Sequence, residues 1–197
     1  MDLKSKIILI SGPTASGKSK FAIQLAKKIN GEVINADSMQ IFKELKILTA
    51  RPHRIDLKNI KHHLYGFKSV KNNYSTGNWL KDAKLKINYI QKKNKIPILV
   101  GGTGLYFKAL IDGIVKIPDI PPTIRNRIRK KQSKMGQIKF YSELVNLDPL
   151  CKKKINKNDT QRSIRAYEVK KFTNKSLFDW YKETYSDFTQ ELSLIHI

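Results

Sequence analysis

One segment near the N-terminus constrains the fold of this chain more than any other feature, because its spacing of glycines and lysine is that of a phosphate-binding P-loop. The segment is Gly12-Pro13-Thr14-Ala15-Ser16-Gly17-Lys18-Ser19. The run 6–11 before it is apolar and β-branched, which predicts a parallel strand buried on both faces. A helix is predicted after the P-loop, and Gly31 is placed to end it. Its apolar face is expected to consist of Phe21, Ala22, Leu25, Ala26 and Ile29.

A loop in this context binds an anion. Its backbone N–H groups point inward, and the N-terminus of the following helix adds about half a positive charge. Lys18 supplies a mobile full charge, and the Ser19 hydroxyl can ligate a Mg²⁺ that bridges phosphate oxygens. The loop therefore predicts a bound phosphate group, although it does not identify a reaction.

The sequence up to residue 113 alternates between strand and helix patterns. Further strands are predicted at 32–36 and 96–100, and helices at 77–94 and 105–111. The alternation predicts an α/β fold with a P-loop NTPase-like parallel sheet as its core. We expect this core to occupy residues 1–113.

The character of the chain changes at residue 114, where prolines mark a boundary. The segment 114–187 lacks strand patterns and is expected to be a basic helical insertion, with helices at 122–134, 138–147, 159–173 and 176–183. Residues 188–197 are expected to return to the core as a strand, with the remainder of the core missing.

The charge is concentrated in this insertion. The 197 residues include 39 Lys and Arg against 16 Asp and Glu, a net charge of +23. A compositional bias could explain the total, since 32 of the basic residues are Lys and 7 are Arg. Residues 114–175, however, carry 17 basic and 5 acidic residues, more than twice the positive charge per residue of the rest. This asymmetry favours a polyanionic partner.

Several classes of protein are excluded by composition. The 40% apolar and 9% aromatic content is too high for a wholly disordered chain. The sequence contains no apolar run long enough to span a membrane and no signal-peptide pattern at its start, so we expect a cytoplasmic protein with no membrane partner. A single cysteine, Cys151, excludes an internal disulfide framework.

Asp37 is the one carboxylate predicted to follow a strand end. Three roles remain open for it: an acid that holds a metal, a general base, or the cap of a following helix. His62 and His63 are adjacent to each other, so their side chains point to opposite sides of an extended chain. The sequence offers no set of Cys or His residues to complete a metal site with them, which argues against one there.

Six segments together resemble the family of tRNA dimethylallyltransferases in order and spacing. They are 12–19 (GPTASGKS), 37–40 (DSMQ), 49–52 (TARP), 62–64 (HHL), 100–106 (VGGTGLY) and 158–166 (NDTQRSIRA). The resemblance extends over essentially the whole chain and implies the N-terminal part of such an enzyme. It also implies transfer of a dimethylallyl group from dimethylallyl diphosphate to N6 of an adenosine beside the tRNA anticodon, with Mg²⁺ as the cofactor.

The same resemblance implies roles for individual residues. The diphosphate would be bound by 12–19 (Gly12, Pro13, Thr14, Ala15, Ser16, Gly17, Lys18 and Ser19), and Mg²⁺ through Ser19. The catalytic residues would be Lys18, Asp37 as general base and Thr103 as a positioning group. The residues expected to contact tRNA are Asp37, Ser38, Met39, Gln40, Thr103, Arg125, Gln161, Arg162, Ser163, Ile164 and Arg165.

Two other functions are compatible with parts of the sequence. A P-loop kinase for small molecules, or a prenyltransferase acting on free adenine nucleotides, would use the same loop, but a small substrate needs no basic insertion. A non-enzymatic RNA-binding module with a vestigial loop would use only the insertion. The expected partners are the tRNA anticodon stem-loop and dimethylallyl diphosphate. We also expect the protein to be a monomer.

Overall fold

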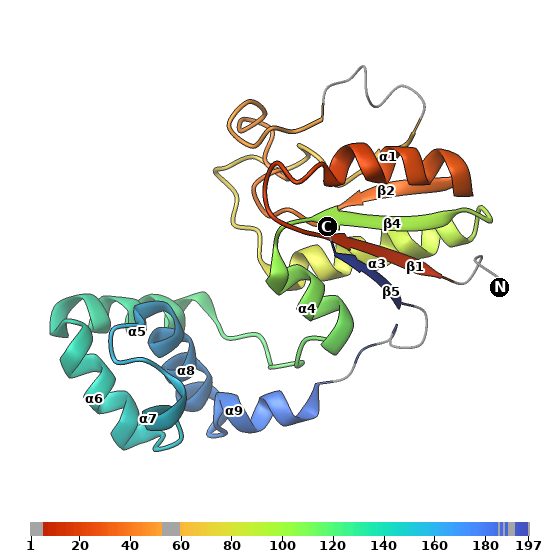
Figure 1. Cartoon of the computed structure of the whole chain (residues 1–197). Coiled ribbons are helices and arrows are strands. Elements are labelled where there is room, and N and C mark those ends of the chain that lie inside the picture. The colour runs from red at the N-terminus through yellow and green to blue at the C-terminus, as the bar shows by residue number, and fades with distance from the viewer. Residues whose placement is uncertain (1–5, 53–59, 185, 187, 189–191, 197) are drawn as a thin grey trace. The chain divides into compact units, whose positions relative to one another are not determined.

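The computed structural model describes residues 6–52, 60–184, 186, 188 and 192–196 (Figure 1). The chain divides into two compact units. The first consists of the segment up to Gly113 together with the segment from Ser186 onward, and the second is Ile114–Tyr185.

The first unit is built on a sheet whose described strands are all parallel. The strands are β1 (Ile7–Ser11), β2 (Gly31–Asn35), β3 (His62–His63), β4 (Ile96–Gly101) and β5 (Leu192–His196), in the order β3-β2-β4-β1-β5. The predicted P-loop NTPase-like α/β core is confirmed. β4 lies between β1 and β2, so the loops that follow β1 and β2 leave the same edge of the sheet but are separated by one strand.

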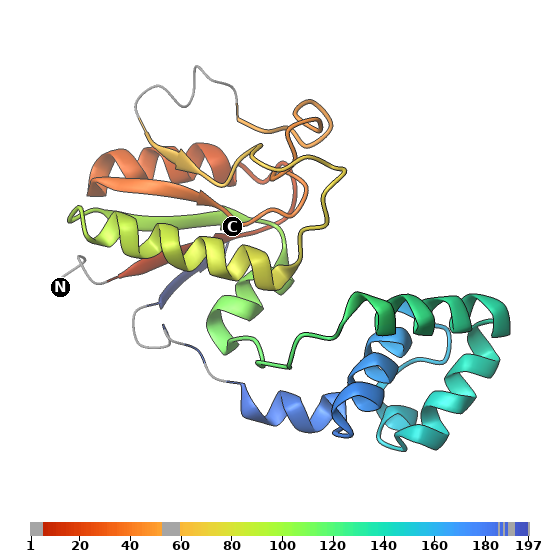
Figure 2. The same ribbon diagram turned by 180° about the vertical axis from the view of Figure 1, so that it is seen from behind.

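Helices cover both faces of this sheet, which is why β1 and β4 are apolar over most of their length (Figure 2). Successive residues of β1 point to opposite faces. Ile8 and Ile10 pack in one cluster with α1 (Lys18–Ile29), and Ile7 and Leu9 pack in another with α3 (Thr76–Gln91) and α4 (Gly104–Asp112). The helix predicted at 77–94 is confirmed as α3, and its buried face consists of Trp79, Leu80, Ala83, Ile87 and Ile90.

Two local predictions were wrong, and one strand was not predicted. Asn30, not Gly31, ends α1, because it adopts the left-handed conformation (φ 55°) and its N–H donates to the Ala26 carbonyl, while Gly31 begins β2. Phe21 is 38% exposed because Ala22 and Ala26 carry the buried stripe of α1. The pair His62–His63 forms β3, a strand too short to give a periodic signal.

The second unit is a bundle of helices. They are α5 (Pro122–Met135), α6 (Gln137–Leu147), α7 (Cys151–Lys154), α8 (Thr160–Thr173) and α9 (Leu177–Trp180), followed by a 3₁₀ turn η1 (Tyr181–Glu183). The short α7 was not predicted, and the helix expected at 176–183 consists of α9 and η1.

Polar contacts fix the helices of this bundle to one another. The Tyr167 hydroxyl on α8 donates to the Glu143 carboxylate on α6 at 2.6 Å, and Lys131 of α5 bonds both groups. Asp159 caps α8 by accepting the backbone N–H of Arg162 at 3.0 Å. These bonds join α5, α6 and α8 around a shared apolar core. No helix among the described residues is both long and apolar enough to cross a membrane.

Candidate functional site

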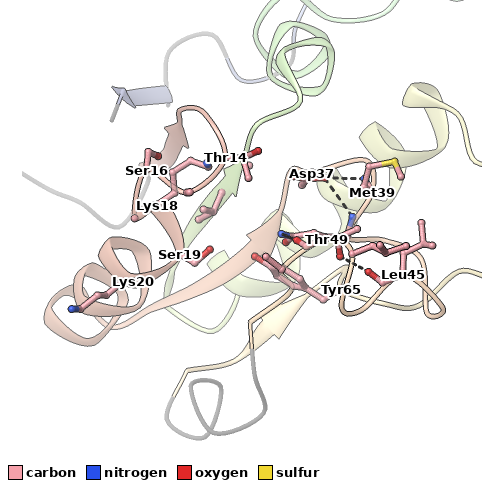
Figure 3. A pocket seen from close by; sticks show the side chains of 17 residues that line it. Thr14, Ser16, Lys18, Ser19, Lys20, Asp37, Met39, Leu45, Thr49 and Tyr65 are labelled. Atoms are coloured by element: carbon pink, nitrogen blue, oxygen red, sulfur yellow. Dashed lines mark hydrogen bonds between the residues drawn. The ribbon is translucent and has the colours of Figure 1, made fainter.

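A pocket of about 540 Å³ lies at the edge of the sheet where the parallel strands end (Figure 3). Such an edge is the usual ligand site of an open α/β sheet, because the loops that leave neighbouring strands meet there. The pocket is lined by residues 14–20 of the P-loop and the start of α1, by Asp37 after β2, and by Val100 and Gly101 at the end of β4. The structure thus brings the predicted anion loop and the predicted acid to one cavity.

The P-loop has the backbone conformation of an anion cradle. Gly17 (φ 83°) and Ala15 (φ 65°) both adopt left-handed conformations, and turns that contain such residues form the concave N–H surfaces that bind anions. The first turn of α1 contains no acidic residue, so its positive end is not neutralised. Lys18 donates to the carbonyl of Pro13.

Ser16 gives a second indication of a ligand in this loop. Its hydroxyl is buried and lacks a hydrogen-bond partner within the part of the chain that the structure describes. A buried hydroxyl without a partner destabilises the fold, so its presence in the pocket wall calls for a polar ligand. A phosphate oxygen would satisfy it.

The carboxylate of Asp37 shapes the turn that follows β2. Its Oδ1 accepts the backbone N–H groups of Met39 at 2.9 Å and Gln40 at 3.4 Å. Among the described residues no donor bonds to Oδ2. The carboxylate therefore caps a turn through one oxygen, with no helix in residues 38–52, while the second oxygen is left as a hydrogen-bond acceptor.

Asn35 fixes the backbone of Asp37 and was missed by the sequence analysis. This side chain is fully buried; its Oδ1 accepts the Asp37 N–H at 3.0 Å and its Nδ2 donates to the Asp37 carbonyl at 2.9 Å and the Leu64 carbonyl at 3.1 Å. Its own carbonyl accepts the Trp79 indole N–H at 2.9 Å. A polar residue at the end of an apolar strand was the available signal.

Thr103 acts on the same turn from behind the pocket wall. Its Oγ1 accepts the Ser38 backbone N–H at 2.9 Å and donates to the Ser38 hydroxyl at 3.2 Å. Of the predicted residues in this region, Asp37, Met39 and Gln40 line the pocket, whereas Ser38 and Thr103 do not. Gly12 and Pro13, at the start of the P-loop, are also outside the lining.

Gly101 allows the end of β4 to approach the chain that carries Asp37. A Cβ atom at Gly101 would lie 2.0 Å from the Ala36 carbonyl oxygen and 2.7 Å from the Asp37 nitrogen. Only glycine fits such a contact with backbone on the other side. The adjacent Gly102 is different, because its nearest neighbour would be the Gly12 carbonyl oxygen at 3.5 Å, an ordinary contact.

A second wall of the pocket was not predicted. It consists of Leu45, Leu48, Thr49, Ala50 and Tyr65. The Gln40 amide donates to the Thr49 carbonyl at 2.8 Å and so ties this wall to the turn after Asp37. Burial and the nearby charge of Asp37 raise the pKa of Tyr65 above its ordinary value, which keeps the phenol neutral. The 49–52 and 62–64 segments of the resemblance adjoin these residues and could have indicated them.

The donors available for a metal ion are few. Within residues 6–52, 60–184, 186, 188 and 192–196, no group of three His, Cys, Asp or Glu side chains is placed to hold one. Mg²⁺ would rest on the Ser19 hydroxyl, phosphate oxygens of a substrate and water, a set that suits its preference for oxygen ligands and retained water. His63 instead bonds to Glu32 at 2.7 Å, away from the pocket.

The predicted RNA contacts of the second unit lie on α5 and α8. Gln161 and Arg162 are exposed, and Arg125 and Arg165 are partly buried. Ser163 and Ile164 face the interior of the bundle, where the Ser163 hydroxyl donates to the Asp159 carbonyl at 2.6 Å.

The sequence model of the IPP transferase family matches residues 40–197. The chain belongs to the IPP transferase family. The resemblance noted in the sequence is therefore confirmed. A tRNA dimethylallyltransferase of Pelagibacter ubique is 63% identical over 188 residues, which are 95% of this chain and 60% of that protein. One of Rickettsia canadensis is 49% identical and covers 89% of this chain and 54% of its own length.

Solved structures of this family have the same fold. A eukaryotic dimethylallyltransferase acting on tRNA matches 97% of this chain and 47% of its own with a TM-score of 0.83 at 30% identity. The full-length tRNA isopentenylpyrophosphate transferase of Bacillus halodurans matches 87% of this chain and 57% of its own with a TM-score of 0.57 at 34% identity. The chain spans about half to three fifths of the length of the curated relatives that it matches.

Proposed function

We propose that the chain serves in the transfer of a dimethylallyl group from dimethylallyl diphosphate to N6 of an adenosine beside the anticodon of tRNA. The observation that carries the proposal is the single pocket lined by both the P-loop and Asp37. One wall suits a leaving diphosphate and the other suits a nucleophile that must lose a proton. Relatives bearing the name tRNA dimethylallyltransferase support this choice of reaction.

The P-loop stabilises the charge that develops on the leaving group. As the bond between C1 of the dimethylallyl group and its oxygen breaks, the electron pair and negative charge pass to diphosphate. Residues 14–19 and the positive end of α1 line the pocket, so donors already in place would meet that charge with little reorganisation at the transition state. Lys18, which bonds to the Pro13 carbonyl in the structure, would turn its ammonium group to the diphosphate. The loop here holds a leaving group and needs no machinery for hydrolysis.

Mg²⁺, bound through Ser19 and phosphate oxygens, would supply further positive charge to the departing diphosphate. Ser16 acts beside it, because its unpartnered hydroxyl is placed to donate to a phosphate oxygen.

Asp37 removes the proton from the acceptor. The exocyclic N6 of adenine is a weak nucleophile, because its lone pair is delocalised into the ring. A carboxylate oxygen within hydrogen-bond reach takes the N6 proton as the carbon–nitrogen bond forms. Oδ2 of Asp37 is available for this, while Oδ1 is held by the backbone of Met39 and Gln40. Asn35 and Thr103 keep the turn, and with it the carboxylate, in position.

The helical unit supplies the RNA-binding surface in this proposal. Its charge suits the phosphate backbone of a tRNA anticodon stem-loop. The target adenine must leave its stack to enter a pocket of this kind, so binding energy from the RNA backbone would offset the cost of extrusion. With tRNA as substrate, we place the protein in the cytoplasm.

Label transfer tests the proposal. The 197 residues are joined to the C-terminal remainder of the Pelagibacter ubique relative and incubated with tRNA and dimethylallyl diphosphate labelled in the dimethylallyl group. We expect label in tRNA, and at least a hundredfold less with Asp37→Asn in the same fusion. Label that stays in the diphosphate, together with phosphate transfer from ATP to a small acceptor, would instead identify a kinase.

A further inference from the structure

Arginine is distributed very unevenly in this chain. Of its basic residues 32 are Lys and 7 are Arg, yet five of the seven Arg lie in two helices of the second unit. Three are on α5 and two are on α8. Arginine differs from lysine in its planar group of N–H donors, which can bind a phosphate through two bonds at once. A chain that otherwise uses lysine therefore places arginine where directed donors matter.

Two of these arginines converge on one buried carboxylate. Nε of Arg129 on α5 lies 3.7 Å from Oε1 of Glu168, and Nη1 of Arg165 on α8 lies 3.7 Å from Oε2. The Glu168 residue is 3% exposed, whereas the side chains of Arg129 and Arg165 are 61% and 40% exposed. One carboxylate beneath the surface thus holds two guanidinium groups from two helices at the surface.

The donors of both arginines remain available. A separation of 3.7 Å is too long for a hydrogen bond, and Oε1 of Glu168 has no hydrogen-bond partner among the described residues. Burying a carboxylate oxygen without such a partner is costly, and a purely structural role would be better served by an apolar side chain of similar size. The attraction of Glu168 fixes where the guanidinium groups lie without consuming their N–H groups.

Arg125 extends the same surface. It lies one turn before Arg129 on α5, so the two side chains leave the helix on the same side. Its Nε is buried and has no hydrogen-bond partner in the described part of the chain. Arg162, by contrast, is paired with Asp159 at the start of α8.

We propose that Arg125, Arg129 and Arg165 form an arginine cluster that binds the phosphodiester backbone of RNA, and that Glu168 is the positioning residue that orients Arg129 and Arg165 for it. This inference rests on the proposed function, which supplies the RNA. It adds a contact residue, Arg129, and assigns a role to a buried acid that the transfer reaction does not use.

Whether Glu168→Gln weakens or tightens RNA binding distinguishes a positioning role from simple charge attraction. Glu168→Gln removes a negative charge and nearly preserves shape, so charge attraction alone predicts tighter RNA binding. Loss of the orienting carboxylate predicts the opposite, because the arginines must then be ordered on binding. We expect roughly fivefold weaker binding. Asp179→Asn is the matched control, since it removes an acid that pairs with Lys182 in the same unit, and it should leave binding unchanged or slightly tighter.

Arg129 provides a second test that does not disturb the core. Arg129→Gln should weaken binding about tenfold and lower the slope of log K against log salt by about 0.7 to 0.9. Lys153→Gln, which removes the same charge from exposed α7, should weaken binding by less than about twofold. Arg129→Lys should fall between the parent and Arg129→Gln, because it keeps the charge and loses the paired donors.

Binding is measured by fluorescence anisotropy of a labelled anticodon stem-loop RNA at several salt concentrations, and folding is checked by thermal unfolding. Weaker binding by Glu168→Gln with an unchanged unfolding midpoint supports the positioning role. Tighter binding by Glu168→Gln overturns that role, and equal effects of Arg129→Gln and Lys153→Gln overturn the cluster; in both cases the proposed transfer stands. If the parent chain binds no RNA, the inference and the RNA part of the proposed function fail together, while pyrophosphate binding by the P-loop remains a separate measurement.

Discussion

Gly101→Ala should damage both the fold and the proposed active site, by an amount that follows from the contacts of the new atom. The added Cβ would lie 2.0 Å from the oxygen and 2.1 Å from the carbon of the Ala36 carbonyl. A carbon and a carbonyl oxygen need about 3.3 Å, so the end of β4 and the chain after β2 must separate by more than about 1 Å. Neither side can yield by rotating a side chain, because both are backbone.

This separation would break specific bonds. The Ala36 N–H donates to the Val100 carbonyl at 2.8 Å, and the Ala36 carbonyl accepts the Thr103 N–H at 3.3 Å. Overpacking of this kind costs about 3 kcal/mol at the upper end of its usual range, which lowers the melting temperature of a chain this size by about 6 to 12 °C. A displacement of about 1 Å at Asp37 would lower the transfer rate about a hundredfold.

Gly102→Ala is the matched control for Gly101→Ala. Gly102→Ala adds the same methyl group one residue later, where the nearest atom would be 3.5 Å away. We expect thermal unfolding of Gly102→Ala within about 1 kcal/mol of the parent, with transfer retained in the fusion protein. If Gly101→Ala unfolds at the same temperature as Gly102→Ala and transfers label equally fast, the close contact between β4 and the Asp37 segment plays no such part.

Three further predictions concern single side chains. Lys18→Ala should weaken pyrophosphate binding at least tenfold in titration calorimetry, because it removes the mobile charge of the loop. Lys20→Ala at the pocket should weaken binding less, and equal losses would contradict the assignment of Lys18 as the phosphate-binding lysine. Thr103→Val should lower the free energy of urea unfolding by about 1 to 2 kcal/mol and slow transfer, since it removes both bonds to Ser38, while Thr103→Ser should retain them; a valine variant as stable and active as the parent would contradict the positioning role. Burial lowers the pKa of His63 below its ordinary 6.5 despite the opposing effect of Glu32, so the folded chain binds this proton less readily than the unfolded chain, and unfolding free energy should fall as pH drops below about 6.5. His63→Gln should flatten that decline in urea titrations from pH 7 to pH 5, and an equally steep decline would assign it to other groups.

The parts of the fold that depend on local pattern could be predicted from the sequence. The buried strands, the P-loop and the inward face of α3 have periodicities that follow from their own residues. Periodicity did not predict the wall formed by 45–50, because side-chain bonds to the loop backbone hold it and no regular apolar pattern marks it. Arg51, for example, donates from its guanidinium to the Phe42 carbonyl at 3.2 Å and lies over Gly66, where a Cβ would collide with it.

The candidate site was predicted in its chemistry more than in its architecture. The sequence indicated an anion loop and an acid, but left three roles open for Asp37. The proposal that it is a general base depends on its place in the pocket wall and on the two backbone bonds to Oδ1, which only the structure supplies. Nor could residue spacing reveal that Thr103 reaches Ser38 rather than the cavity, since the two residues are 65 positions apart in the chain.

The strand order also limits what can bridge the two sides of the pocket. The loop after β1 and the turn after β2 leave the sheet with β4 between them, so they start about two strand spacings apart, roughly 10 Å. A lone phosphate ion is too short to touch both. A pair of reactants placed end to end spans that distance, with the carbon that changes partners near the middle. In the proposed reaction, the order of three strands thereby sets the combined length of the two substrates.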